Sequence, residues 1–300
     1  MLIGYNITMG QHYSIESEYI KAEISDRGGE LKSLIDTETN IEYIWQGKRA
    51  IYPWSSMLMY PIVGKLKDNQ YRLGNKYFRL DKNGFAKDLK FEVKNHRKDS
   101  ISLVLNSDKD TLVSFPFDFN MVLHYKVYGP RLTLTVELKN MGKKELLYSL
   151  GFAPVVNLPI DKEALEDYYI EFSHEEERGA YFLDNELVNF HHVDDKRFLV
   201  GKRINLTHDM FQKGEMIFKD VNTTSIALKN RATEKAFEID FGNASYISIW
   251  SQPGYPFIQL SPTYGVADAV DSDNDFYKKE GLMVLDQERS TKFEYSFFIR

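Results

Sequence analysis

The chain has 300 residues, a formal net charge of −6 and no cysteine. Lysine and arginine are interspersed with aspartate and glutamate, which excludes the concentrated basic surface of a nucleic-acid-binding protein. The absence of cysteine excludes disulfides and thiolate metal sites and agrees with a reducing compartment. No apolar run approaches the ~20 residues that a membrane-spanning helix needs, and residues 1–8 lack the pattern of a signal peptide. We therefore expect a soluble, cytoplasmic protein.

A single domain covering residues 1–300 is expected, because no linker rich in proline, glycine or serine separates halves of different composition. Aromatic residues make up 14% of the chain, and this favours strands, where rings fit a half-buried pleated surface.

The first part of the chain alternates short apolar runs with turn residues. Residues 19–24 and 30–35 flank Asp26-Arg27-Gly28-Gly29, and the segment 12–45 as a whole has the pattern of a β-meander. Further along, residues 71–80 contain Gly74-Asn75 between two strand-like runs, which predicts a hairpin.

The same rhythm continues to the end of the chain. Residues 162–169 form the only segment with a short helical pattern. Further strands are expected at residues 102–105, 120–128, 131–138, 226–228, 236–241, 246–250, 257–260 and 292–299. Regular short strands with almost no helix predict a β-sandwich or a β-barrel.

Asn157 is the single amide in the apolar stretch Tyr148–Pro159. An unpaired buried amide would cost about 1–3 kcal/mol, so we expect its side chain to be buried and hydrogen-bonded. Such an amide either bridges two backbone segments or lines a ligand pocket.

His191-His192 and Asp194-Asp195 lie close together in the sequence. Their neighbours are those of a solvated loop, and no pair of them has the i, i+4 spacing of ligands on a helix. We expect no metal and no cofactor.

Four motifs resemble, in order along nearly the whole chain, those of the aldose 1-epimerases or galactose mutarotases, and in particular the bacterial mutarotase-related group. They are Pro61-Ile62-Val63-Gly64-Lys65-Leu66-Lys67-Asp68, Asn83-Gly84-Phe85-Ala86-Lys87-Asp88, Gly151-Phe152-Ala153-Pro154-Val155-Val156-Asn157 and the segment from Phe257 to Ala267. The resemblance implies an all-β fold, a large antiparallel β-sandwich with an open cleft that takes a hexose as its small-molecule partner.

The resemblance also indicates which positions should correspond to the family's catalytic and sugar-binding residues. Mutarotation needs an acid at the ring oxygen and a base at the anomeric hydroxyl. The family's histidine acid matches Ala153, and its glutamate base matches Ser261. Lys65 and Asn83 replace an arginine and a histidine, and Gly214 matches an aspartate that binds sugar hydroxyls. All five positions are expected to line one cleft.

Three functions stay open at this point. The chain can be a sugar-binding protein in which catalysis is weak or absent, because Ala153 and Ser261 cannot shuttle the required protons. It can be an active epimerase that uses substitutes such as Glu215, Asp268 or His192. It can also be a β-sandwich whose cleft binds no sugar. The chemistry favours the first.

Aromatic residues near the motifs offer one further expectation for a sugar site. Trp250, Tyr255 and Tyr264 could stack on a sugar face, although packing in the core is the commoner use of such rings.

Overall fold

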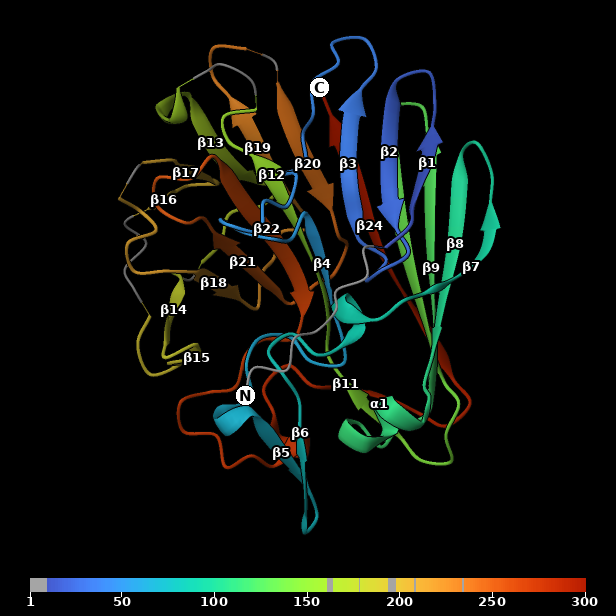
Figure 1. Ribbon diagram of the computed structural model, residues 1–300. Coiled ribbons are helices and arrows are strands. Elements are labelled where there is room, and N and C mark those ends of the chain that lie inside the picture. The colour runs from blue at the N-terminus through green and yellow to red at the C-terminus, as the bar shows by residue number, and fades with distance from the viewer. Residues whose placement is uncertain (1–9, 161–163, 178, 194–197, 208, 234) are drawn as a thin grey trace.

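Two large antiparallel sheets make up most of the fold, as the alternating pattern predicts (Figure 1). The computed structural model describes residues 10–160, 164–177, 179–193, 198–207, 209–233 and 235–300. Within these residues the larger sheet has ten strands. In spatial order they are β16 (Leu199–Val200), β17 (Arg203–Asn205), β13 (Tyr168–Phe172), β19 (Ser225–Asn230), β20 (Ala236–Asp240), β24 (Ser290–Ile299), β10 (Arg131–Asn140), β9 (Phe119–Tyr128), β8 (Ser100–Asn106) and β7 (Glu92–His96).

The second sheet has seven strands among the described residues. Their spatial order is β15 (Leu187–Val188), β14 (Tyr181–Asp184), β18 (Met216–Lys219), β21 (Tyr246–Trp250), β22 (Phe257–Tyr264), β12 (Leu150–Asn157) and β4 (Ser56–Met59). The strands β4 and β22 lie on the two sides of β12, although they are far apart in the sequence.

Three smaller strand groups complete the β-structure of the described residues. The predicted meander is confirmed as β1 (His12–Glu16), β2 (Ile20–Ser25) and β3 (Leu31–Asp36). The predicted hairpin is confirmed as β5 (Gln70–Leu73) and β6 (Lys76–Arg79). The strands β11 (Leu146–Tyr148) and β23 (Met283–Leu285) form a two-stranded pair.

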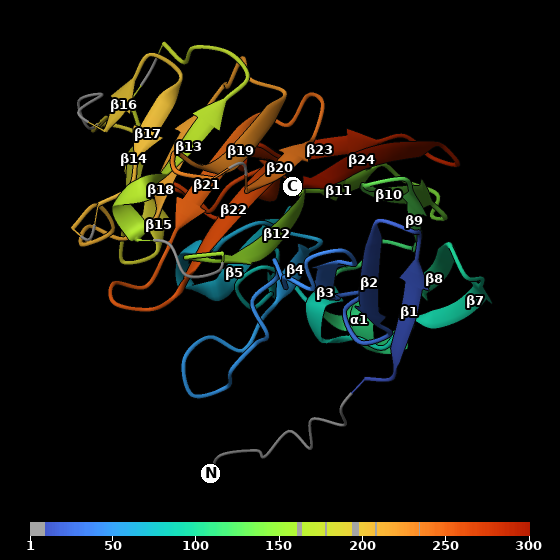
Figure 2. The same ribbon diagram turned by 90° about the horizontal axis from the view of Figure 1, so that it is seen from above.

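The two large sheets pack face to face. The phenyl ring of Phe152 in the seven-stranded sheet lies 5.8 Å from that of Phe297 in the ten-stranded sheet, and Phe172 and Phe218 lie 5.3 Å apart across the same interface. Seen from above, β19, β20 and β24 form one row and β18, β21 and β22 another row beside it (Figure 2). This confirms the expected sandwich, while the expectation of one domain over residues 1–300 stays a prediction.

Helical structure is scarce. The one α-helix of the described residues, α1 (Lys109–Ser114), was not predicted, although Asp108 caps its first turn and Thr111 completes a capping box. The remaining helical segments in the part of the chain that the structure describes are the 3₁₀ turns η1 (Lys67–Asn69), η2 (Ala86–Asp88), η3 (Leu165–Asp167) and η4 (Phe276–Lys278). Among the described residues, no helix is both long enough and apolar enough to cross a membrane.

The helix expected over residues 162–169 was wrong. Residues 161–163 lie outside the described part of the chain, Leu165–Asp167 form a single 3₁₀ turn, and Tyr168 begins strand β13. The run Tyr168-Tyr169-Ile170 is aromatic and β-branched, which favours a strand once it can pair with β19.

Candidate functional site

A cavity of about 330 Å³ opens on the face of the seven-stranded sheet that points away from the ten-stranded sheet. We call it the pocket. Small-molecule sites usually have volumes of about 300–1,000 Å³, so the pocket lies at the small end of that range. The described residues that line it are Tyr52, Met59, Val63, Gly64, Lys82, Asn83, Leu183, Glu186, Lys213, Gly214, Glu215, Ile217, Tyr246, Ser248, Trp250, Gln259, Thr263, Gly265, Val266 and Ala267.

Strand periodicity explains how the sheet forms the floor of the pocket. Side chains alternate between the two faces of a strand. In β21, Ile247 and Ile249 are fully buried in the core, whereas Tyr246, Ser248 and Trp250 line the pocket. The neighbouring strand β22 follows the same rule, with Gln259 and Thr263 on the pocket side. Two adjacent strands thus supply five lining residues.

One wall of the pocket is aromatic and carries a fixed amide. The rings of Tyr52 and Trp250 lie 5.2 Å apart. The Tyr52 hydroxyl donates to Gln259 Oε1 over 2.9 Å, and Gln259 Nε2 donates to Ser261 Oγ over 2.9 Å. Burial raises the pKa of Tyr52 above its ordinary value, so this hydroxyl stays a donor near neutral pH.

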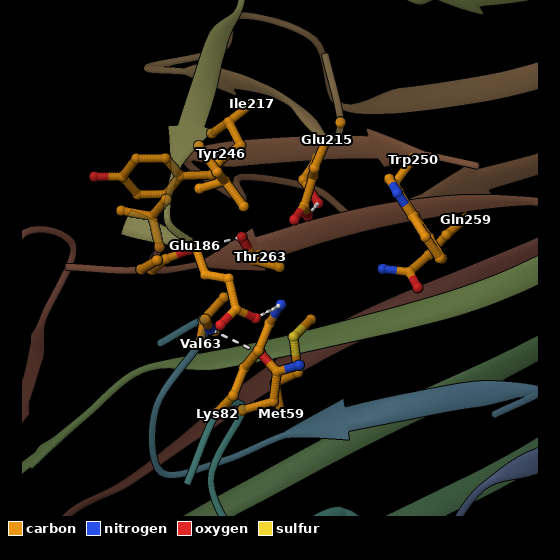
Figure 3. A pocket seen from close by; sticks show the side chains of 18 of the residues that line it. Met59, Val63, Lys82, Glu186, Glu215, Ile217, Tyr246, Trp250, Gln259 and Thr263 are labelled. Atoms are coloured by element: carbon orange, nitrogen blue, oxygen red, sulfur yellow. Dashed lines mark hydrogen bonds and ion pairs between the residues drawn. The ribbon is translucent and has the colours of Figure 1, made fainter. Parts of the chain in front are cut away.

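Glu215 enters the pocket from the segment before β18, and Figure 3 shows its side chain pointing into the pocket from the side opposite Lys82 and Met59. The hydroxyl of Ser248 donates to the Glu215 carboxylate. Ser248 lies opposite Ser261 in the register of β21 and β22. The Glu215 carboxylate is therefore hydrogen-bonded to β21, the strand beside Ser261, which is the residue predicted to match the family's base.

The far end of the pocket is charged. Glu186, in the turn between β14 and β15, accepts from Lys65 Nζ over 2.8 Å and from Lys82 Nζ over 3.0 Å. These two hydrogen bonds hold the pKa of Glu186 below its ordinary value. Figure 3 shows the Glu186 carboxylate beside the Lys82 ammonium, near Val63 and Met59.

The five residues expected in one cleft occupy different depths. Asn83 and Gly214 line the pocket. Lys65 is not among the described lining residues but reaches the pocket through its ion pair with Glu186. Ala153 and Ser261 are 1% and 0% exposed and are not among the described lining residues. Ala153 belongs to the small apolar cluster that contains Met59, and Ser261 accepts a hydrogen bond from Gln259. The roles of all five stay predictions.

Asn83 uses its amide to join two loops. Its Oδ1 accepts from the Gly64 amide nitrogen over 2.8 Å, and its own backbone nitrogen donates to Gly64 oxygen over 2.9 Å. Its Nδ2 contacts Met57 Sδ at 3.2 Å. The Asn83 side chain, predicted to replace the family's histidine, is thus part of the framework of the pocket.

Of the three suggested substitutes for the missing acid and base, Glu215 alone is among the described lining residues. Asp268 is buried in an ion pair with Lys279, at 3.1 Å. His192 is exposed in a loop. The neighbouring Asp194 and Asp195 lie outside the described residues, and the described ones contain no group of three metal-ligating side chains.

Of the three aromatic residues expected near a sugar, one is among the described residues that line the pocket. Trp250 lines the pocket, Tyr255 is 38% exposed outside it, and the Tyr264 hydroxyl donates to the backbone oxygen of Phe241.

Asn157 is half-buried, and its Nδ2 donates to the backbone oxygens of Glu42 and Ile44. The Nδ2 group is hydrogen-bonded as predicted and ties β12 to the backbone of residues 42–44. The expected burial was wrong, because the side chain is only half-buried, and Asn157 is not among the described residues that line the pocket.

Several described residues with polar groups in the pocket were missed by sequence reasoning, among them Lys82, Gln259, Tyr52 and Glu186. Lys82 directly precedes the Asn83 motif, and Gln259 is two residues before Ser261 in the last motif, so a closer interpretation of the motif neighbourhoods could have found both. Tyr52 and Glu186 lie in segments without a motif, and nothing in their sequence context indicates a site.

Comparisons with known proteins agree with this architecture. A galactose mutarotase related enzyme from Lactobacillus acidophilus superimposes with a TM-score of 0.91 at 26% identity, covering 97% of each chain. A galactose mutarotase-like protein from Lactobacillus casei gives a TM-score of 0.90 at 26% identity, covering 97% of this chain and 100% of the other. The fold is therefore that of the galactose mutarotase-like β-sandwiches.

The sequence comparisons define the family. The model of the aldose 1-epimerase family matches residues 11–263. The chromosomal protein LacX of Lactococcus lactis is 24% identical over 271 residues, which cover 87% of this chain and 90% of LacX. The chain belongs to the aldose 1-epimerase family, and the predicted resemblance is confirmed.

Proposed function

We propose that this protein binds a hexose or a hexose derivative in the pocket. The observation that carries the proposal is the pairing of an aromatic wall, Tyr52 and Trp250, with polar groups at the same cavity, among them Gln259 and Glu215. A pyranose has apolar C–H faces that suit an aromatic ring and a rim of hydroxyls that suits fixed donors and acceptors. Membership of the aldose 1-epimerase family supports the same substrate class.

Catalysis by the family's own positions is weak or absent in this proposal. Ala153 has no ionisable group, and Ser261 is a buried hydroxyl that accepts from Gln259. Loss of one positioned acid or base lowers a rate by about 10²–10⁴, so the loss of both brings turnover close to the spontaneous reaction.

A second candidate function, interconversion of sugar anomers, is favoured by one observation. Glu215 supplies a carboxylate to the pocket and is held by Ser248, the cross-strand neighbour of Ser261. In this candidate Glu215 takes the proton of the anomeric hydroxyl in place of the family's glutamate. The missing acid would still need a donor on the opposite side of the sugar.

Titration calorimetry with glucose and galactose tests the binding proposal. We expect saturable binding by the wild-type protein and weaker binding by the variant Trp250→Ala, because the substitution removes one face of the aromatic wall. The matched control is Tyr255→Ala, which changes a partly exposed ring outside the described lining. No heat of binding at millimolar sugar would overturn the proposal.

A further inference from the structure

We propose that Glu186, together with Lys82 and Lys65, recognises two adjacent hydroxyl groups of the bound sugar and so sets which hexoses the pocket accepts. This inference rests on the proposed function. It assigns the specificity of the pocket to its charged end, away from the aromatic wall and from Glu215.

The first argument is the geometry of the lysines. Lys65 follows Gly64 and Lys82 precedes Asn83, and Gly64 and Asn83 are joined by two hydrogen bonds of 2.8 and 2.9 Å. The two lysines therefore start from adjacent points of one fixed framework. Both ammonium groups reach the same carboxylate, one on each oxygen of Glu186.

The second argument is the placement of Glu186. Asn185 and Glu186 form the two-residue turn between β14 and β15, with φ angles of 51° and 70°. Asparagine adopts this left-handed conformation readily, whereas for a glutamate it is uncommon. The turn directs a glutamate side chain to the pocket at a position where a glycine or asparagine would be the usual choice.

The third argument is that the turn and the lysine loop share an anchor. The Asp268 amide nitrogen donates to Lys65 oxygen over 2.9 Å, and Asp268 oxygen accepts from the Val188 amide over 2.8 Å. The carboxylate of Asp268 is itself buried in the ion pair with Lys279. The segment that carries Glu186 and the segment that carries Lys65 are therefore held in register before any ligand arrives.

The chemistry of this end fits a diol. An ionised carboxylate only accepts hydrogen bonds and an ammonium group only donates them, whereas a hydroxyl does both. Of two adjacent sugar hydroxyls, one can donate to Glu186 while the other accepts from Lys82. About half of the Glu186 side chain is exposed, which leaves acceptor positions open to a ligand beside its two lysine partners.

The test combines one substitution with a series of sugars. Wild-type protein and the variant Glu186→Gln are titrated with galactose, glucose and the monodeoxy analogues of each. Hydrogen bonds to charged groups imply that the variant binds the parent hexose about tenfold to a hundredfold more weakly. For the hydroxyl that Glu186 recognises, the wild type should distinguish the parent sugar from its deoxy analogue, and the variant should not.

This loss of discrimination separates recognition from a structural role, because a merely distorted pocket weakens all analogues by a similar factor. Lys82→Gln provides a second variant, with the same expectation for the adjacent hydroxyl. The matched control is Glu92→Gln, since Glu92 forms an exposed ion pair with Lys94 at 2.8 Å on the other sheet. It should bind as the wild type does.

The outcomes are distinguishable. If the wild type binds none of the sugars, the proposed function fails and this inference fails with it. If the wild type binds but Glu186→Gln and Lys82→Gln keep the wild-type affinity, or lose it evenly for every analogue, the inference alone is overturned and Glu186 is an ordinary surface ion-pair partner.

Discussion

Ser248 and Ser261 lie directly opposite each other on β21 and β22, and each is engaged by a different pocket residue. Ser248 donates to the carboxylate of Glu215, while Ser261 accepts from the amide of Gln259. The pocket thus has a carboxylate near Ser261, the residue predicted to match the family's base, and this carboxylate comes from another segment of the chain.

Polarimetry on freshly dissolved α-galactose or α-glucose measures catalysis directly. We expect the wild-type protein to interconvert the anomers little faster than buffer, because Ala153 and Ser261 cannot carry the two protons. A clear acceleration that disappears in Glu215→Gln would contradict this expectation and establish the second candidate function. An acceleration that persists in that variant would exclude Glu215 as the base.

A glutamate placed at Ser261, the predicted position of the family's base, should disturb the protein. Ser261→Glu places a larger side chain in a fully buried position and a second negative charge near Glu215. We expect it to lower the free energy of unfolding by about 1–3 kcal/mol from overpacking alone. Ser261→Gln, which adds similar volume without charge, should be less damaging, and adding Glu215→Gln to Ser261→Glu should recover part of the loss.

Urea unfolding of these variants checks the expectation. Equal stabilities for Ser261→Glu and Ser261→Gln would show that the two carboxylates do not interact.

The buried ion pair behind the pocket wall should be important for stability. Lys279→Met leaves the carboxylate of Asp268 buried without its cation, and breaking such a pair costs about 3–5 kcal/mol. The neighbouring Lys278→Met is the control, because Lys278 is 68% exposed and solvent screens its ion pair with Asp273, so the substitution should change the free energy of unfolding far less. Chemical denaturation of both variants measures the difference, and equal values would refute the structural role of the pair.

Gly64 should tolerate no side chain. Its φ is 71°, and a Cβ there would lie 2.5–2.7 Å from atoms of Ala267. We expect Gly64→Ala to lower the free energy of unfolding by about 2–5 kcal/mol, from left-handed strain plus the clash. Gly74→Ala isolates the strain, since Gly74 has a φ of 57° with no atom within 4 Å of the added Cβ, and should cost about 1–2 kcal/mol. Thermal or urea unfolding compares the two.

The ion pairs of Glu186 predict a pH dependence. Lys65 and Lys82 lower the pKa of Glu186 below its ordinary value of 4.5, so the folded state binds this proton less readily than the unfolded state. The resulting stabilisation is complete above about pH 4.5 and is lost as the pH falls through the lowered pKa. Because Glu186 is half-exposed, the gain is below about 1 kcal/mol. Unfolding of wild type and Glu186→Gln from pH 7 to pH 3 should converge at the acid end, and a constant difference would contradict the assignment.

The strands were predictable from the sequence because their pattern is local. The alternation in β9 and β10 and the turn at Gly74-Asn75 depend only on near neighbours. The burial of Ala153 and Ser261 could not be predicted from the sequence, because it depends on the side chains of neighbouring strands that cover them. The pairing of Glu186 with Lys65 joins segments that no sequence motif connects, and it becomes visible only after the sheet order is known.

The position of β4 at the edge of the seven-stranded sheet has a consequence for biosynthesis. All four residues of β4, Ser56–Met59, are buried in the folded protein. Within that sheet β4 pairs only with β12, and the other neighbour of β12 is β22, near the end of the chain. During translation the side chains of β4 are therefore exposed before β12 and β22 have been synthesised. The pocket, whose floor includes Gln259 and Thr263, cannot exist on the ribosome until β22 has emerged. Synthesis of the last part of the chain therefore sets the earliest moment at which a ligand can be bound.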